Sequence, residues 1–309
     1  MTLMAVLAVG CAGETTQPTA PPSHTGLAST LVPNTNLDVY VYIKQENPTT
    51  VPKDLIGTPS DVVAESLALW GVATEDKFVL GGGLTLVSAA DAARIYPLIL
   101  SQTEFWAKLS DRTIYFVQGS GTPAEALKTV ISKNDFKQYD DQQALEEVAL
   151  FPDGGTTKLV AIGIIKPSKT LVSLMTKNVD PATLGMVNTL LKWASIQVMT
   201  AGLYSAQPID AAEVVRGVER GNIWESDLGI LASVKSGLPG FVVSPIIKRF
   251  LGNAGYTETQ LGELSLHQAS WDAGNGTTIH ILLRIDGNRI FAAMSGNESY
   301  AQTLITSVK

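Results

Sequence analysis

An internal repeat is the feature that most constrains the fold of this 309-residue chain, because two similar segments should form two similar units. When the sequence is aligned with itself, identical residues pair in order along its two halves. These pairs include Val79 with Val198, Gly83 with Gly202, Asp91 with Asp210, Asn134 with Asn253 and Met175 with Met294. Small gaps add Trp70 with Trp193 and Trp106 with Trp224. We therefore predict a tandem duplication, with repeats in residues 34–180 and 181–309.

Hydrophobic periodicity and turn residues predict the same order of elements in both segments. In the first we expect helix 60–70, strand 76–87, helix 89–108, strand 113–117, helix 123–133 and strands 145–151, 157–166 and 169–175. In the second we expect helix 181–193, strand 195–205, helix 208–223, strand 228–234, helix 242–252 and strands 260–271, 277–285 and 289–294. This α-β-α-β-α-β-β-β order predicts an α+β fold of mixed sheets with helices on one face.

Three further elements complete the prediction. A strand at residues 39–44 precedes the first repeat, and a helix at residues 298–308 ends the chain. The tripeptide Asp286-Gly287-Asn288 indicates a tight hairpin between two strands.

Composition and charge exclude several classes of protein. With 45% hydrophobic residues the chain has enough apolar material for sizeable cores and does not resemble a disordered protein. The formal net charge is −7, and no basic cluster is longer than Lys248-Arg249, so the sequence argues against a nucleic-acid partner. No stretch beyond residue 11 has the roughly 18 to 20 uninterrupted apolar residues of a membrane-spanning helix.

The single cysteine, Cys11, closes an apolar run that ends Leu7-Ala8-Val9-Gly10. The rest of the chain therefore contains no disulfide, thiolate metal site or cysteine nucleophile. The run resembles the lipobox of bacterial lipoprotein precursors. The resemblance implies that residues 1–11 hold a signal peptide, that cleavage precedes Cys11, and that Cys11 carries lipid such as palmitate. It also implies an extracytoplasmic location on the cell membrane or outer membrane. Separately, the strand predicted at 39–44 resembles the start of the folded part of some bacterial extracytoplasmic proteins.

Residues 12–33, AGETTQPTAPPSHTGLASTLVP, have the composition of a linker. They are rich in Thr, Pro, Ser, Gly and Ala and carry few large apolar side chains that could form a core. We predict a flexible tether that joins the lipid on Cys11 to the folded body.

The residues shared by the two segments have structural and functional interpretations. Asp91 and Asp210 each lie near the start of a predicted helix, where a carboxylate binds free backbone N–H groups, and we favour this over catalysis. The repeated tryptophans are interpreted as core anchors and not as halves of a binding cage. Glu147 and Glu263 lie on predicted strands, where we expect them to face solvent and not to form an acid–base pair.

The glycine motifs and histidines also have structural alternatives. Gly81-Gly82-Gly83 lies in a predicted strand, which favours a bulge or close approach over a phosphate loop. Gly119-Ser120-Gly121 lacks the spacing of a nucleophile elbow and is predicted as a loop. His24 lies in the tether. His267 and His280 could face each other on a hairpin, but two imidazoles lack the third ligand of a zinc site.

The sequence therefore nominates no catalytic, cofactor-binding or metal-binding residue, and Cys11 is its only assigned site, for lipidation. We predict a membrane-anchored extracytoplasmic lipoprotein with a non-catalytic binding or scaffolding role towards an envelope protein. An alternative is a carrier of a small apolar ligand held between the two repeats. A hydrolase is a third interpretation, although no nucleophile and base are evident.

Overall fold

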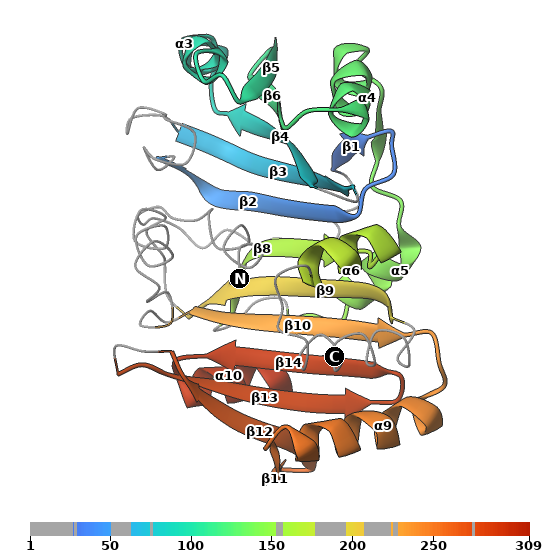
Figure 1. The fold of residues 1–309 in the computed structure, drawn as a ribbon. Coiled ribbons are helices and arrows are strands. Elements are labelled where there is room, and N and C mark those ends of the chain that lie inside the picture. Colours follow the sequence, from blue (N-terminus) through green and yellow to red (C-terminus); the bar gives the residue numbers. More distant parts are fainter. Residues whose placement is uncertain are drawn as a thin grey trace.

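The computed structural model describes residues 27, 30–50, 63–74, 77–152, 157–176, 196–206, 224, 228–273 and 276–309. One twelve-stranded sheet, in the order β11-β12-β13-β14-β10-β9-β8-β2-β3-β4-β6-β5, runs through the described molecule (Figure 1). Two short strands, β1 (Leu31–Pro33) and β7 (Phe136–Gln138), form a separate ladder. The expected α+β class is confirmed.

The strands of the large sheet divide between the two halves of the chain. From the first half come β2 (Val39–Thr50), β3 (Val63–Ala73), β4 (Phe78–Leu86), β5 (Phe105–Ser110), β6 (Thr113–Gln118) and β8 (Lys158–Ile165). From the second half come β9 (Ile196–Ser205), β10 (Leu228–Ser236), β11 (Thr257–Leu261), β12 (Leu264–Asp272), β13 (Thr278–Asp286) and β14 (Arg289–Ser295). The pairing of β8 with β9 joins the two halves into one sheet.

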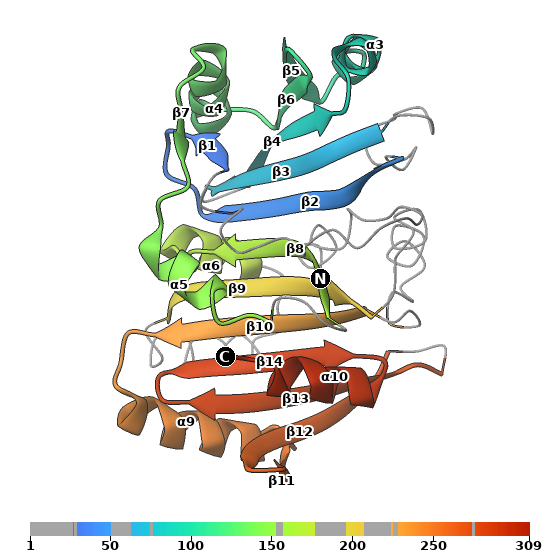
Figure 2. The ribbon, with the colours of Figure 1, turned by 180° about the vertical axis from the view of Figure 1, so that it is seen from behind.

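Helices cover both faces of this sheet, which corrects the expectation that they lie on one face. On one face lie α4 (Thr122–Ser132), α5 (Gln142–Val148) and α10 (Glu298–Thr306). On the other lie α3 (Ala89–Leu100), α6 (Lys169–Thr176) and α9 (Gly240–Asn253). Figures 1 and 2 view the molecule from opposite sides: α9 lies in front of the sheet in Figure 1, and α10 lies in front of it in Figure 2. The physical reason is that apolar side chains alternate along the strands: Tyr40 packs on the first face, and Val39 and Val41 on the second.

Strand pairing also differs from the mixed pairing that we expected, because the strand pairs of the described residues are all antiparallel. The first predicted βαβ unit shows why. The helix expected at 89–108 ends at Leu100, and β5 follows it as an edge strand. The chain then reverses at Asp111 and returns as β6 between β4 and β5, antiparallel to both.

The described elements do not confirm the tandem duplication. The pair β4–β6 followed by α4 does correspond to the pair β9–β10 followed by α9. Beyond this unit the two segments differ, because α5 and α6 occupy positions that align with strands of the second segment. Strand order differs as well for β8 and β13, which the repeat predicts to be equivalent. In the first segment β2 and β3 separate β8 from β4, on the side of β4 away from β6. In the second segment β14 alone separates β13 from β10, on the side of β10 away from β9.

Other predicted elements have mixed outcomes. The strand at 39–44, the final helix and the Asp286-Gly287-Asn288 hairpin are confirmed by β2, α10 and the β13–β14 pairing. The helix expected at 60–70 is wrong, because Val63–Ala73 forms β3 and pairs with β2 and β4. The helices expected at 181–193 and 208–223 lie outside the described residues.

Part of the expected tether belongs to the folded body. Leu27 is buried in the core that contains α4 and α5, and the hydroxyl of Tyr40 donates to the Thr30 hydroxyl at 2.6 Å. Residues 31–33 pair with β7 as β1. The predicted boundary at residue 33 is therefore too late, because the apolar side chains of this short stretch are enough to dock it. Within the described residues, no helix has the length and apolar character needed to cross a membrane.

Candidate functional site

A fully buried carboxylate marks the most unusual polar site of the described molecule. Glu147 is 0% exposed and lies in α5, not on the solvent-facing strand that the sequence suggested. Asp141 begins this helix by accepting the Ala144 backbone N–H at 3.1 Å. The residues that follow, Gln-Gln-Ala-Leu-Glu-Glu, are strong helix formers. The expected strand at 145–151 is therefore wrong because helix propensity and the cap outweigh the short apolar pattern.

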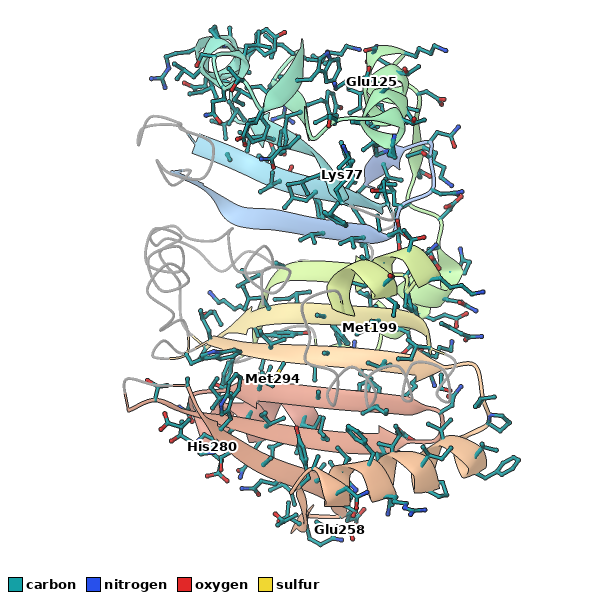
Figure 3. The ribbon with its side chains drawn as sticks, in the orientation of Figure 1. Lys77, Glu125, Met199, Glu258, His280 and Met294 are labelled. Carbon is teal, nitrogen blue, oxygen red and sulfur yellow. The ribbon has the colours of Figure 1, made fainter. Side chains whose placement is uncertain are left out.

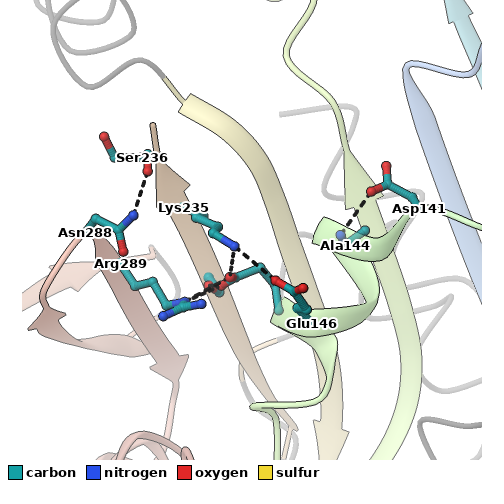
Figure 4. A network of polar contacts seen from close by, with 9 residues as sticks. Asp141, Ala144, Glu146, Lys235, Ser236, Asn288 and Arg289 are labelled. Carbon is teal, nitrogen blue, oxygen red and sulfur yellow. Dashed lines mark hydrogen bonds and ion pairs between the residues drawn. The ribbon is translucent and has the colours of Figure 1, made fainter. Parts of the chain in front are cut away.

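The Glu147 carboxylate binds three side chains from two neighbouring strands. Arg289 Nε donates to its two oxygens at 2.8 and 3.2 Å, and Lys235 Nζ lies 3.4 Å from Oε1. The Ser233 hydroxyl donates to Oε2 at 2.9 Å. Figure 4 shows Lys235 and Arg289 converging on this point, with Glu146 as a second, exposed partner of Lys235 at 3.3 Å.

The positive charges of Lys235 and Arg289 explain why a buried carboxylate is tolerated at this position. Lys235 and Arg289 are direct cross-strand partners on β10 and β14, an arrangement in which like charges repel. Glu147 lies between the two cations and neutralises part of their charge. A buried carboxylate needs such partners, because the loss of its hydration would otherwise be costly. The cluster thereby fastens α5, which precedes β8, to strands of the second half.

The cluster has a poor arrangement for catalysis. A serine hydroxyl bound to a carboxylate resembles a nucleophile with its base. Here, however, both carboxylate oxygens already accept hydrogen bonds from Arg289, and the Ser233 hydroxyl is held between its strand and Oε2. Ser233 and Glu147 are also both buried, so a substrate has no access to them. The geometry supports a structural latch.

A continuous row of side chains crosses the sheet beneath this cluster. From β6 to β14 the row runs Val117, Gly81, Trp70, Tyr40, Ile164, Thr200, Ser233 and Phe291. Two of its polar atoms, Trp70 Nε1 and Thr200 Oγ1, are buried without a hydrogen-bond partner within the described structure. So is the hydroxyl of Tyr139, whose ring stacks on Tyr40 at 4.9 Å. Periodicity alone could not identify this row, because it depends on strand register.

Asp91 lies where the sequence places it, in the first turn of α3. The Ser88 hydroxyl accepts the Asp91 backbone N–H at 3.0 Å and donates to Asp91 Oδ2 at 2.7 Å. This hydrogen bond from Ser88, followed by the interaction with Arg94, lowers the pKa of Asp91. The predicted position of Asp91 at the start of a helix is therefore confirmed, but the cap is the Ser88 hydroxyl, and the Asp91 carboxylate binds Ser88 and Arg94 side chains. Its predicted equivalent, Asp210, lies outside the described residues.

The tryptophans do not form a common site. Trp70 is fully buried and packs with Tyr115 and Phe136, which confirms it as a core anchor. Trp106 packs in the same core, whereas its predicted equivalent Trp224 packs in the core on the other face. Trp193 is not among the described residues.

The glycine motifs have structural roles. Gly81-Gly82-Gly83 lies in β4 without a bulge, paired in register with β3 and β6. A Cβ on Gly82 would lie 2.4 Å from the Phe116 ring, so the bare backbone admits an aromatic ring, as the close-approach interpretation expects. The loop predicted at Gly119-Ser120-Gly121 is confirmed; its second glycine caps α4 with a φ of 91°.

The histidines are separated by strand register. His267 pairs with Leu283, whereas His280 pairs with Ser270, so the two imidazoles point to opposite faces of the β12–β13 hairpin. His280 lies 3.9 Å from a Glu298 oxygen. Glu263 is exposed, but in the turn between β11 and β12 and not on a strand. Among the described residues, no three or more His, Cys, Asp or Glu side chains gather as a metal site would require. Cys11 and His24 fall outside the described ranges.

Comparisons with known proteins give only distant similarities. No protein-family model and no curated protein matches the sequence. Crystal form III of TP0453 is 13% identical, with a TM-score of 0.37 over 94% of this chain and 99% of TP0453. Crystal form I is 11% identical, with a TM-score of 0.36 over 90% and 96% of the two chains.

Proposed function

We propose that this protein is a membrane-anchored extracytoplasmic lipoprotein. The observation that carries the proposal is the position of Cys11 after Leu7-Ala8-Val9-Gly10 and before a Thr- and Pro-rich segment. Because Leu27 and Thr30 contact the folded body, we propose residues 12–26, the Thr- and Pro-rich part of the predicted linker, as the tether. As a flexible coil, a segment of this length has a root-mean-square reach of about 21 Å. That reach is sufficient to hold the body beside a bilayer surface.

Replacement of Cys11 tests the anchor. In cells fed an alkyne analogue of palmitate, the parent protein should incorporate label and sediment with membranes. Cys11→Ala should lose both properties, because it removes the thiol that accepts the lipid. Ala12→Ser is the matched control and should behave as the parent. Retention of Cys11→Ala in membranes without label would disprove a lipid anchor at this position.

We further propose a non-catalytic binding or scaffolding role towards another envelope protein. The buried Glu147 cluster is closed to substrates, which argues against a catalytic role there. Large aromatic side chains are instead exposed at the surface: Phe241 is 82% exposed and Trp271 is 59% exposed. Aromatic residues are enriched in protein interfaces, so their exposure supports a binding role.

Crosslinking in cells tests this role. When a photoreactive amino acid replaces Phe241 or Trp271, illumination should produce a discrete crosslinked adduct. The absence of an adduct from both positions would contradict the binding role.

We also infer that the sequence repeat reflects an ancient duplication of a smaller unit than the sequence suggests. The unit β4–β6–α4 and the unit β9–β10–α9 share order and pairing, and they contain Gly83 with Gly202 and Asn134 with Asn253. An experimental structure in which these two units fail to superpose would remove this support.

A further inference from the structure

The two edges of the twelve-stranded sheet are protected to different degrees. At one edge, β5 is covered by α3, whose buried residues share a core with Ala107. Ala107 is only 6% exposed, and the Tyr96 hydroxyl donates to its backbone carbonyl at 3.4 Å. A covered edge of this kind cannot add another strand.

The other edge, formed by β11, is open. A two-residue turn at Gly262 and Glu263 joins β11 to β12 and closes on the pair Leu261–Leu264. Because such turns close on a hydrogen-bonded pair and antiparallel pairs alternate, Glu258 and Gln260 direct their backbone N–H and C=O groups away from β12. Both residues are exposed, and within the described chain these backbone groups have no hydrogen-bond partner.

The negative charge on this edge is partly neutralised. Unpaired charges commonly protect edge strands from association. The Glu258 carboxylate, however, accepts a hydrogen bond from Ser265 at 3.0 Å and lies 3.5 Å from the Lys248 ammonium of α9. Figure 3 shows Glu258 at the extreme end of the sheet. A neighbouring strand with a neutral or basic residue at this position would therefore meet little repulsion.

We propose that the outer edge of β11 binds an extended segment of another polypeptide as a thirteenth strand. Two outward N–H and two outward C=O groups at strand spacing match a polypeptide backbone. A second copy of this chain would present the same acidic strand, so like carboxylates would lie close together. This inference rests on the proposed binding role and names its site.

The location of this edge suits a tethered protein. The chain enters the body beside β2, where Thr30 contacts Tyr40. Seven strand spacings separate β2 from β11 in the sheet order, which corresponds to about 34 Å. The open edge therefore lies away from the attachment point and is free to receive a partner.

Gln260→Pro provides a selective test, because it removes the outward N–H of Gln260 and leaves the β11–β12 hydrogen bonds in place. Gln260→Ala is the matched control, since it changes the side chain and keeps the N–H. We would select phage-displayed eight-residue peptides on the full-length parent protein. Selected peptides should bind Gln260→Ala as they bind the parent and Gln260→Pro at least tenfold more weakly. Equal melting temperatures of the two variants would show that the fold is retained.

Hydrogen exchange on the parent protein gives a readout that needs no variant. A bound peptide should slow exchange at the backbone N–H of Glu258 and Gln260 and leave the inward-facing Thr259 unchanged. Failure to select any peptide, or equal binding to Gln260→Pro, would overturn the proposal. A dimer that Gln260→Pro abolishes would show that the occupant is a second copy and would also overturn it. None of these results depends on Cys11, so lipid anchoring is judged separately.

Discussion

At the residue scale, Glu147 is the side chain whose removal should matter most. Glu147→Ala leaves Lys235 and Arg289, which are both half-buried, facing each other without their anion. Because both cations remain partly exposed to water, the expected cost is that of losing hydrogen bonds to a charged group, about 1.5 to 3 kcal/mol of unfolding free energy. Urea unfolding of the purified protein would measure the loss.

Its neighbour provides the control. Glu146 also contacts Lys235, but from an exposed position on the same helix. Glu146→Ala should therefore cost no more than about 1 kcal/mol. Equal losses for the two variants would show that burial of Glu147 is energetically unimportant.

A second prediction at this scale concerns Thr200. Its hydroxyl is buried beside the cluster without a partner in the described structure, so folding removes it from water without replacing that interaction. Thr200→Val has nearly the same shape and should raise unfolding free energy by about 1 kcal/mol. Thr200→Ser, which keeps the hydroxyl and loses a methyl group, should lower it. A clear loss of stability in Thr200→Val would indicate that an internal water molecule binds the hydroxyl.

At the scale of single elements, α3 depends on Ser88, the residue that precedes it. Ser88→Ala removes the acceptor for the Asp91 backbone N–H, and loss of such a cap typically costs about 1 kcal/mol. Ser88→Asn keeps an acceptor and should remain close to the parent. Thermal unfolding of both variants would check this. If Ser88→Ala melts like the parent, the start of α3 is held by packing alone.

Elements with a strong local signal could be predicted from the sequence. The Asp286-Gly287-Asn288 turn fixes the β13–β14 hairpin, and Ser88 fixes the start of α3. Elements that depend on tertiary partners could not. The segment that forms β3 contains helix-favouring residues such as Ala64, Glu65 and Leu67, but hydrogen bonding to β2 and β4 on both sides determines its conformation.

The Glu147 cluster could not be predicted without the register of the strands. Glu147 could have been placed on a helix from Asp141 and the helix formers that follow it. Its partners could not have been found in this way, because Ser233, Lys235 and Arg289 lie far away in the sequence. Only the alignment of β10 with β14 brings the two cations together beneath α5. The order of twelve strands is likewise not contained in local periodicity.

At the scale of the whole molecule, the two halves share one sheet and one polar latch. The pairing of β8 with β9 continues the hydrogen-bonded ladder across the boundary predicted near residue 180. Glu147 adds a contact from α5 to β10 and β14 of the second half. We therefore expect both halves to unfold in one cooperative transition, in contrast to the two independent units that a simple duplication implies.

Alkaline pH should destabilise this whole structure through its buried tyrosines. Burial raises the pKa of Tyr40 and of Tyr139 well above the ordinary value near 10. Above pH 10 the unfolded chain loses these protons while the folded chain keeps them, so unfolding releases protons and becomes more favourable as pH rises. Each tyrosine should lower unfolding free energy by about 1.4 kcal/mol per pH unit in this range.

Urea unfolding at a series of pH values from about 9 to about 11.5 would measure this slope, because the range lies on both sides of the ordinary tyrosine pKa. Tyr139→Phe should be at least as stable as the parent at pH 7, because its buried hydroxyl has no partner in the described structure, and should reduce the alkaline slope by one proton. An unchanged slope in Tyr139→Phe would show that this hydroxyl ionises as readily in the folded protein as in the unfolded chain.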